Sequence, residues 1–140
     1  MHSEMETEFI SHTNWSKYKS RPYIVSYDQY LASKFEGLHF YKGFTATNVG
    51  FYGPQGRVLR LKTEDDGLND KLASFGFKGL KITNLEMETS GIYGLAKLLG
   101  HRAISLNAII ANRSTGEFSE NPAEVMDTLI QKTLKALTKA

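Results

Sequence analysis

The chain lacks cysteine, a long apolar run and a strong net charge, and each absence excludes a class of function. Zero cysteines exclude disulfides and thiolate chemistry. The 17 basic and 15 acidic residues are dispersed and leave a net charge of +2, which gives no indication of a nucleic-acid partner. No stretch reaches the roughly 18 apolar residues of a membrane span, and the acidic start from Met1 to Phe9 is unlike a signal peptide. We therefore expect a soluble, cytoplasmic protein without a membrane or nucleic-acid partner.

Histidine is also sparse, and its spacing is unlike that of a metal site. His2, His12, His39 and His101 lie far apart in the sequence and lack the short ligand spacings of zinc sites. No serine lies in the pattern of a nucleophile elbow. The sequence thus predicts no bound metal and gives no sign of a serine nucleophile.

The residues that are present suffice for a core and predict an α/β fold. With 140 residues, 41% of them hydrophobic, the chain fits a single domain over residues 1–140, with 1–20 interpreted as a loosely ordered lead-in. Strands are predicted at 23–25, 38–47, 57–61, 77–85 and 103–111. Helices are predicted at 28–35 (capped by Ser26), 67–75, 88–99 and from Pro122 onward (capped by Asn121). This alternation indicates a sheet with helices on its faces.

The later elements are expected to be the most buried. The helix at 88–99 has little polar face, and the segment 103–111 is almost continuously apolar, as in a central strand. The last helix carries an apolar stripe that we expect to be buried, made of Val125, Met126, Leu129, Ile130, Leu134 and Leu137.

The stretch from Asn84 to Gly91 lies where a predicted strand ends and an apolar helix begins. Open α/β sheets bind their ligands at such carboxyl edges. Glu86 and Glu88 flank Met87 here, but on a helix a spacing of two would point the carboxylates about 200° apart, which disfavours a facing acid–base pair. The alternatives left open are a ligand contact by at least one glutamate and simple compensation of the helix dipole.

A second candidate is the loop from Gly50 to Arg57, which contains three glycines. A predicted strand follows it, whereas phosphate-binding loops lead into a helix, so phosphate binding is disfavoured. The amide of Gln55 and the guanidinium of Arg57 together match the acceptor–donor–acceptor edge of uracil, and Phe51 could stack on the base. A surface turn with a solvated arginine is the alternative.

Three short motifs occur in a family-specific order: Phe51-Tyr52-Gly53-Pro54-Gln55-Gly56-Arg57, Glu86-Met87-Glu88, and Ile109-Ile110-Ala111-Asn112-Arg113. On these motifs, the chain from about Tyr23 to its end resembles the carboxyl-terminal half of the nucleoside phosphorylase family, most closely its uridine-specific members. The resemblance implies part of a three-layer α/β/α sandwich with a mixed sheet.

The resemblance also implies a role for each candidate residue. The base would be held by Gln55 and Arg57 and bordered by Phe51, Ile110 and Ala111; the ribose would be lined by Met87 and bound by Glu88, with Glu86 beside it; and Arg113 would position the loop that carries Arg57. Asn112 stands where purine-specific relatives commonly have aspartate, which favours a pyrimidine nucleoside.

The implied activity is that of a pentosyltransferase, which converts uridine and phosphate to uracil and ribose 1-phosphate. Phosphate is a co-substrate, no cofactor is implied, and relatives assemble as homo-oligomers such as dimers or hexamers. Residues 1–49 do not resemble the phosphate-binding half of the family, so we expect a fragment or truncated product that is not competent alone. A purine nucleoside phosphorylase, a nucleosidase and a non-catalytic nucleoside-binding module are the alternatives.

Overall fold

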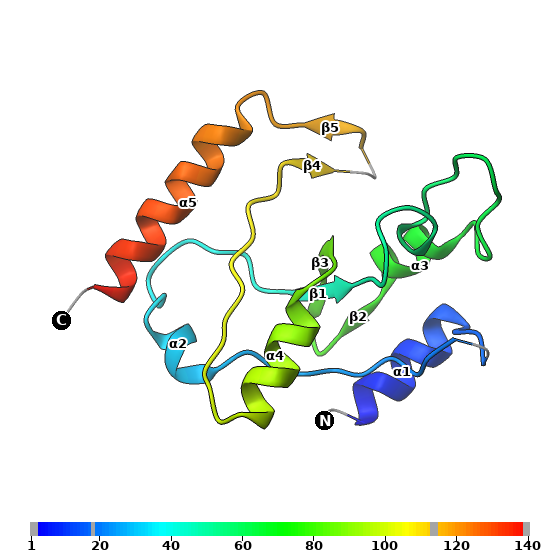
Figure 1. The fold of residues 1–140 in the computed structure, drawn as a ribbon, viewed down its shortest axis with the longest axis horizontal. Coiled ribbons are helices and arrows are strands. Elements are labelled where there is room, and N and C mark those ends of the chain that lie inside the picture. The colour runs from blue at the N-terminus through cyan, green and yellow to red at the C-terminus, as the bar shows by residue number, and fades with distance from the viewer. Residues whose placement is uncertain (1–2, 18, 113–114, 139–140) are drawn as a thin grey trace. The chain divides into compact units, whose positions relative to one another are not determined.

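The structure is a computed structural model, and it describes residues 3–17, 19–112 and 115–138 (Figure 1). The elements in chain order are α1 (Ser3–Thr13), α2 (Gln29–Ser33), β1 (Phe44–Thr47), the 3₁₀ turn η1 (Gly53–Gln55), α3 (Leu68–Ser74), β2 (Gly76–Phe77), β3 (Leu80–Glu86), α4 (Thr89–Leu98), β4 (Ala111–Asn112), β5 (Glu117–Phe118) and α5 (Pro122–Leu137). None of the helices in these ranges is long and apolar enough to cross a membrane.

The chain forms two compact units. The first comprises residues 1–26 and 40–101, and the second comprises residues 27–39 and 102–140. The first unit contains a three-stranded sheet in the order β1-β3-β2, and the second contains the two-stranded β4-β5 sheet. The larger sheet is mixed, because β3 runs parallel to β1 and antiparallel to β2. The predicted mixed α/β fold is therefore confirmed.

The core of the first unit surrounds Phe75, which is 2% exposed. The edge of its ring meets Phe9 of α1, with ring centroids 5.2 Å apart, and the ring of Phe44 from β1 lies 6.5 Å away. Leu68 and Leu72 of α3 are buried beside it. Residues 3–13, which showed no clear pattern in the sequence, thus form a helix that is fixed by tertiary packing through Phe9.

Short sequence patterns predicted several helices and strands correctly. The helices α3, α4 and α5 match their predicted ranges, and the Asn121 side chain accepts a hydrogen bond from the backbone N–H of Glu124 as an N-cap does. The predicted strand at 77–85 is a hairpin, in which Lys78 and Gly79 turn with positive φ of 48° and 81° between β2 and β3. The cap of α2 is Asp28, not the predicted Ser26, because the Asp28 carboxylate accepts from the N–H of Leu31.

Four predicted strands are wrong or much shorter than expected. Residues 23–25 and 57–61 form no strand. Of the segment 38–47 only β1 pairs with another strand, and of 103–111 only Ala111 does, as the first residue of β4. A strand exists only where its backbone groups pair with a neighbouring strand, and side-chain composition does not supply that neighbour.

The expected burial of α4 and α5 is also wrong. Leu95 and Leu98 of α4 are 61% and 84% exposed, and Leu134 of α5 is 57% exposed. The apolar stripes are present as the sequence predicts, but burial requires a second element to cover them. Within the described ranges these side chains remain largely uncovered.

Candidate functional site

The candidate site begins where two neighbouring parallel strands end. β1 leads into the loop from Asn48 to Gly56, and β3 leads through Glu86 into α4. Because the strands are parallel, both carboxyl ends lie at the same edge of the sheet. The backbone N–H of Asn48 donates to the carbonyl of Glu86 at 2.7 Å, which joins the two ends. The two stretches singled out from the sequence therefore belong to one edge.

The first stretch is a compact cluster around η1. The Nη1 group of Arg57 donates to Oε1 of Gln55 at 2.9 Å and also to the backbone carbonyl of Phe51. The guanidinium lies over the Phe51 ring, 3.6 Å from its centroid, which is a cation–π contact. Gln55 is only 3% exposed. The structure thus brings Phe51, Gln55 and Arg57 into direct contact and holds the guanidinium in a fixed orientation.

The loop that carries these side chains closes through backbone bonds. The N–H of Gly56 donates to the carbonyl of Gly53 at 2.9 Å, and the N–H of Arg57 donates to the carbonyl of Tyr52 at 3.0 Å. Gly56 takes a φ of +73°, in the left-handed region that favours glycine. Its hydrogen therefore occupies the place where other residues carry a Cβ atom.

We predict that Gly56→Ala destabilises the protein by about 2 kcal/mol. A left-handed residue with a Cβ costs roughly 1–2 kcal/mol, and this Cβ would also lie 2.6 Å from Nδ2 of Asn69. Chemical denaturation measures the change. Gly53→Ala is the matched control, since a Cβ there meets nothing within 4 Å. Equal stabilities of the two variants would contradict the assigned loop conformation.

Glu86 holds the second stretch, residues 84–91, in place through hydrogen bonds. Its carboxylate accepts hydrogen bonds from the hydroxyl of Thr47, from the N–H of Glu88 at 2.7 Å and from the N–H of Thr89 at 2.6 Å. Burial by itself would raise the pKa of Glu86, but the hydrogen bonds outweigh burial, so the pKa lies below its ordinary value. The carboxylate is therefore ionised and already bonded to the start of α4.

Met87 and Glu88 are both exposed at the same edge. The Glu88 carboxylate accepts from the N–H of Met87 at 3.2 Å, and the backbone of Glu88 occupies the N-cap position of α4. A carboxylate of this kind keeps acceptor capacity for hydroxyl groups. Of the two glutamates, Glu88 is the more accessible and Glu86 is the more constrained.

The remaining predicted site residues belong to the second unit or are not described. Ile110 and Ala111 belong to the second unit, where the carbonyl of Ile110 accepts from the N–H of Ser119 at 2.9 Å and Ala111 begins β4. Arg113 lies outside the described residues.

Sequence reasoning missed the role of Thr45 and Thr47. In the register of β1 against β3, Thr45 faces Asn84 and Thr47 faces Glu86, and both pairs are hydrogen-bonded. Thr47 also accepts from the N–H of Ser90 at 3.0 Å. The alternation Thr-x-Thr and Asn-x-Glu puts each pair of side chains on one face of its strand, and this spacing was the available signal.

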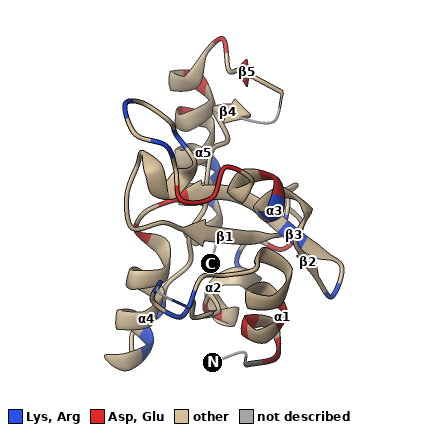
Figure 2. Cartoon of the chain, turned by 90° about the vertical axis from the view of Figure 1, so that its right-hand side faces the viewer, with Lys and Arg blue, Asp and Glu red and all other residues tan. Residues whose placement is uncertain are grey.

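Charged residues of both signs are interspersed along the chain (Figure 2). Within residues 3–17, 19–112 and 115–138, no group of three or more His, Asp or Glu side chains could hold a metal ion.

Comparison with solved structures gives the class of fold. The chain is similar to a nucleoside phosphorylase from Trypanosoma brucei that shows uridine phosphorylase activity, with a TM-score of 0.62 and 23% sequence identity over 99% of this chain and 41% of that chain. The arrangement of elements is thus that of part of a nucleoside phosphorylase fold.

Sequence comparison finds similarity to a uridine phosphorylase. Over 90 residues the chain is 36% identical to a uridine phosphorylase from Thermococcus kodakarensis, which covers 60% of this chain. The chain spans only 30% of the length of that relative. No family model matches the sequence. The chain is therefore similar in sequence and in fold to nucleoside phosphorylases.

Proposed function

We propose that this chain supplies the base- and ribose-binding part of a uridine phosphorylase-type active site. The observation that carries the proposal is the contact of Arg57 with Gln55 and Phe51 at the sheet edge that also carries Glu88. The similarity to the Thermococcus kodakarensis uridine phosphorylase supports the same conclusion.

The base is recognised through its hydrogen-bonding edge. Uracil offers two carbonyl oxygens on either side of an N–H; the amide of Gln55 accepts from the N–H and donates to one oxygen, and Arg57 donates to the other oxygen. Because a carbonyl oxygen has two lone pairs, Oε1 of Gln55 can keep its bond from Arg57 and still accept from uracil. The resemblance assigns Ile110 and Ala111 to the border of the base and Arg113 to the positioning of the loop that carries Arg57, and these roles stay predictions.

The ribose is held by the start of α4. Glu88 accepts from the ribose hydroxyls, and Met87 provides an apolar wall. Glu86 is a positioning residue. Its carboxylate accepts a hydrogen bond from the N–H of Glu88 and so fixes the backbone of the residue that binds the ribose.

The proposed reaction is phosphorolysis. An oxygen of phosphate forms a bond to C1′ of the ribose, the bond between C1′ and N1 of uracil breaks, and its electron pair leaves with the base. Arg57 and Gln55 stabilise the negative charge that develops on the uracil oxygens, and Glu88 favours positive charge on the sugar. No cofactor takes part. We place the phosphate-binding groups outside residues 1–140, and the assembly into dimers or hexamers stays a prediction.

Calorimetric titration and a turnover assay test the proposal. We expect the purified chain to bind uridine more tightly than adenosine or inosine, and to release uracil from uridine and phosphate only when the remainder of a phosphorylase protomer is supplied. Preference for adenosine or inosine would indicate a purine phosphorylase or nucleosidase. Uridine binding without turnover in the complete assembly would indicate a non-catalytic nucleoside-binding module, and rapid phosphorolysis by the chain alone would refute the placement of the phosphate site.

A further inference from the structure

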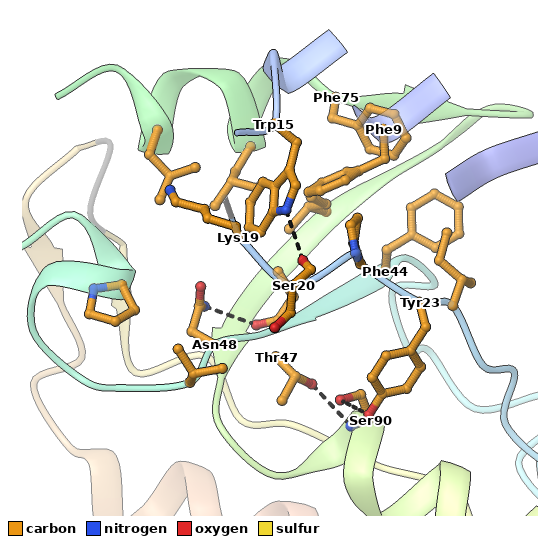
Figure 3. Close-up of a pocket in the computed structure, with 18 of the residues that line it drawn as sticks. Phe9, Trp15, Lys19, Ser20, Tyr23, Phe44, Thr47, Asn48, Phe75 and Ser90 are labelled. Carbon is orange, nitrogen blue, oxygen red and sulfur yellow. Dashed lines mark hydrogen bonds between the residues drawn. The ribbon is translucent and has the colours of Figure 1, made fainter. Parts of the chain in front are cut away.

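A pocket of about 650 Å³ lies in the first unit (Figure 3). It is bounded by α1 and the segment that follows it, by α3, by the strands β1 and β3, and, at the carboxyl edge of the sheet, by Asn48, Val49, Gly53, Pro54 and Ser90. Its volume falls within the roughly 300–1,000 Å³ range of small-molecule sites. Of the residues proposed to hold base and ribose, none lines it. The pocket therefore adjoins the candidate nucleoside site at the same sheet edge but is lined by other residues.

The walls of the pocket are rich in aromatic rings. Phe9, Trp15, Tyr23, Phe44 and Phe75 all line it, and Figure 3 shows these rings coming from α1, the following segment, β1 and the end of α3. The Phe9 and Trp15 rings lie 5.7 Å apart and tilted by 51°, so they form a corner. Rings arranged in this way offer faces and edges to another flat aromatic group.

The charges around the pocket are balanced. Lys19 and Arg21 are matched by Glu64 and Asp65 in the lining. Lys19 pairs with Glu64 at 3.4 Å, and its ammonium lies 5.0 Å from the centre of the Trp15 ring. The Lys71 ammonium bonds Asp65 at 2.8 Å and holds the pKa of that carboxyl below its usual range. Three of the four charges in the lining are thus already paired, and the fourth, Arg21, is exposed to solvent.

One end of the pocket is polar. The hydroxyls of Tyr23 and Ser90 lie 2.9 Å apart, and the Asn48 side chain donates to the carbonyl of Ala46 at 3.2 Å (Figure 3). An amide has both donor and acceptor groups, and a hydroxyl pair can donate or accept. This end can therefore orient a single neutral polar group of a ligand.

From these features we infer that the pocket binds an uncharged, flat aromatic molecule whose one hydrogen-bonding group points toward Asn48 and Ser90. The inference goes beyond the proposed nucleoside reaction and does not depend on it. The aromatic walls favour a planar ring system, and the paired charges of Lys19, Glu64 and Asp65 disfavour a free carboxylate or ammonium, because its desolvation would not be fully compensated.

The test uses the single tryptophan of the chain as a reporter. Its indole N–H donates to the carbonyl of Ser20 at 3.0 Å beside the pocket and gives one NMR resonance of its own. We expect naphthalene-2-carboxamide to shift this resonance saturably. Naphthalene-2-carboxylate, which has the same rings and an added charge, is expected to bind at least about tenfold more weakly by calorimetry, because its charge must be desolvated.

Two variants and a control locate the binding. Ala46→Phe fills the pocket, and Trp15→Ala removes one wall; each is expected to weaken calorimetric binding of the carboxamide by at least about tenfold. Leu98→Ala, at an exposed position on α4 that does not line the pocket, is expected to leave it unchanged. The absence of a saturable shift, equal affinity for the carboxylate, or displacement of the probe by uridine would each overturn the inference.

Discussion

The Arg57→Ala chain is expected to bind uridine about 10- to 100-fold more weakly than the unaltered chain. A hydrogen bond from a charged donor contributes about 1.5–3 kcal/mol, and each 1.4 kcal/mol corresponds to about a tenfold change in affinity. The substitution removes the guanidinium that contacts Gln55 and Phe51, so it also removes the fixed orientation of the donors. Calorimetric titration with uridine measures the loss.

In a complete phosphorylase assembly the same substitution should lower kcat as well as raise KM. Loss of one preorganised donor to a developing anion typically costs about 10²–10³ in rate. Arg57→Lys should recover only part of the activity, because an ammonium does not provide two parallel donors.

Arg60→Ala is the matched control for Arg57. Arg60 is exposed and lies three positions further along the chain. Its replacement alters the net charge by the same amount as Arg57→Ala, so a general electrostatic effect would appear in both variants. Unchanged uridine binding and turnover in Arg57→Ala would remove Arg57 from the site.

The second large effect is expected at Glu86. We predict that Glu86→Gln destabilises the folded protein by about 1–3 kcal/mol, the usual cost when part-buried hydrogen-bonding groups lose a charged partner. The carboxylate accepts from Thr47 and from the N–H groups of Glu88 and Thr89, and an amide cannot replace both of its oxygens as acceptors. Thr47→Val, which removes the hydroxyl between β1 and α4, should destabilise in the same direction. Chemical denaturation at neutral pH measures both changes.

The pH dependence of stability gives a sharper test of Glu86. Its pKa in the folded protein lies below the value of 4.5 expected for a free glutamate. The stabilisation is therefore fully present above that value and is lost as the pH falls through the lower, folded-state pKa. Unfolding measured from pH 7 down to pH 3 should show this acid-side loss in the unaltered chain and a smaller loss in Glu86→Gln. Identical acid profiles would contradict the assigned role.

Glu88→Gln separates the two glutamates. Glu88 is exposed, and its carboxylate accepts a hydrogen bond from the adjacent N–H of Met87. We expect this variant to keep its stability but to bind uridine more weakly, because a neutral amide is a poorer acceptor for ribose hydroxyls than a carboxylate. If Glu88→Gln instead lost stability and Glu86→Gln instead lost uridine binding, Glu86 would be the ribose-binding residue and Glu88 the positioning residue.

The sequence was most informative where a structure is defined by neighbouring residues. The cap at Asn121, the turn that needs Gly56 and the apolar periodicity of α4 all depend on a few adjacent positions, and each is present in the structure. The motif that contains Phe51, Gln55 and Arg57 is equally local, and the structure shows that Arg57 contacts the other two side chains. Strand prediction was weaker, because 57–61 has a strand-like pattern but no strand beside it.

By itself, then, the sequence determined the mixed α/β class, the helices and the chemical types of side chain at two strand ends. Only the tertiary structure decided which strands pair and what the side chains do there. Thr47 and Glu86 are 39 positions apart, and their hydrogen bond exists because β1 lies parallel to β3 in one particular register. That register turns Glu86 from a candidate ribose ligand into the residue that fixes the start of α4, because a carboxylate already bonded to backbone N–H groups has less capacity for a substrate.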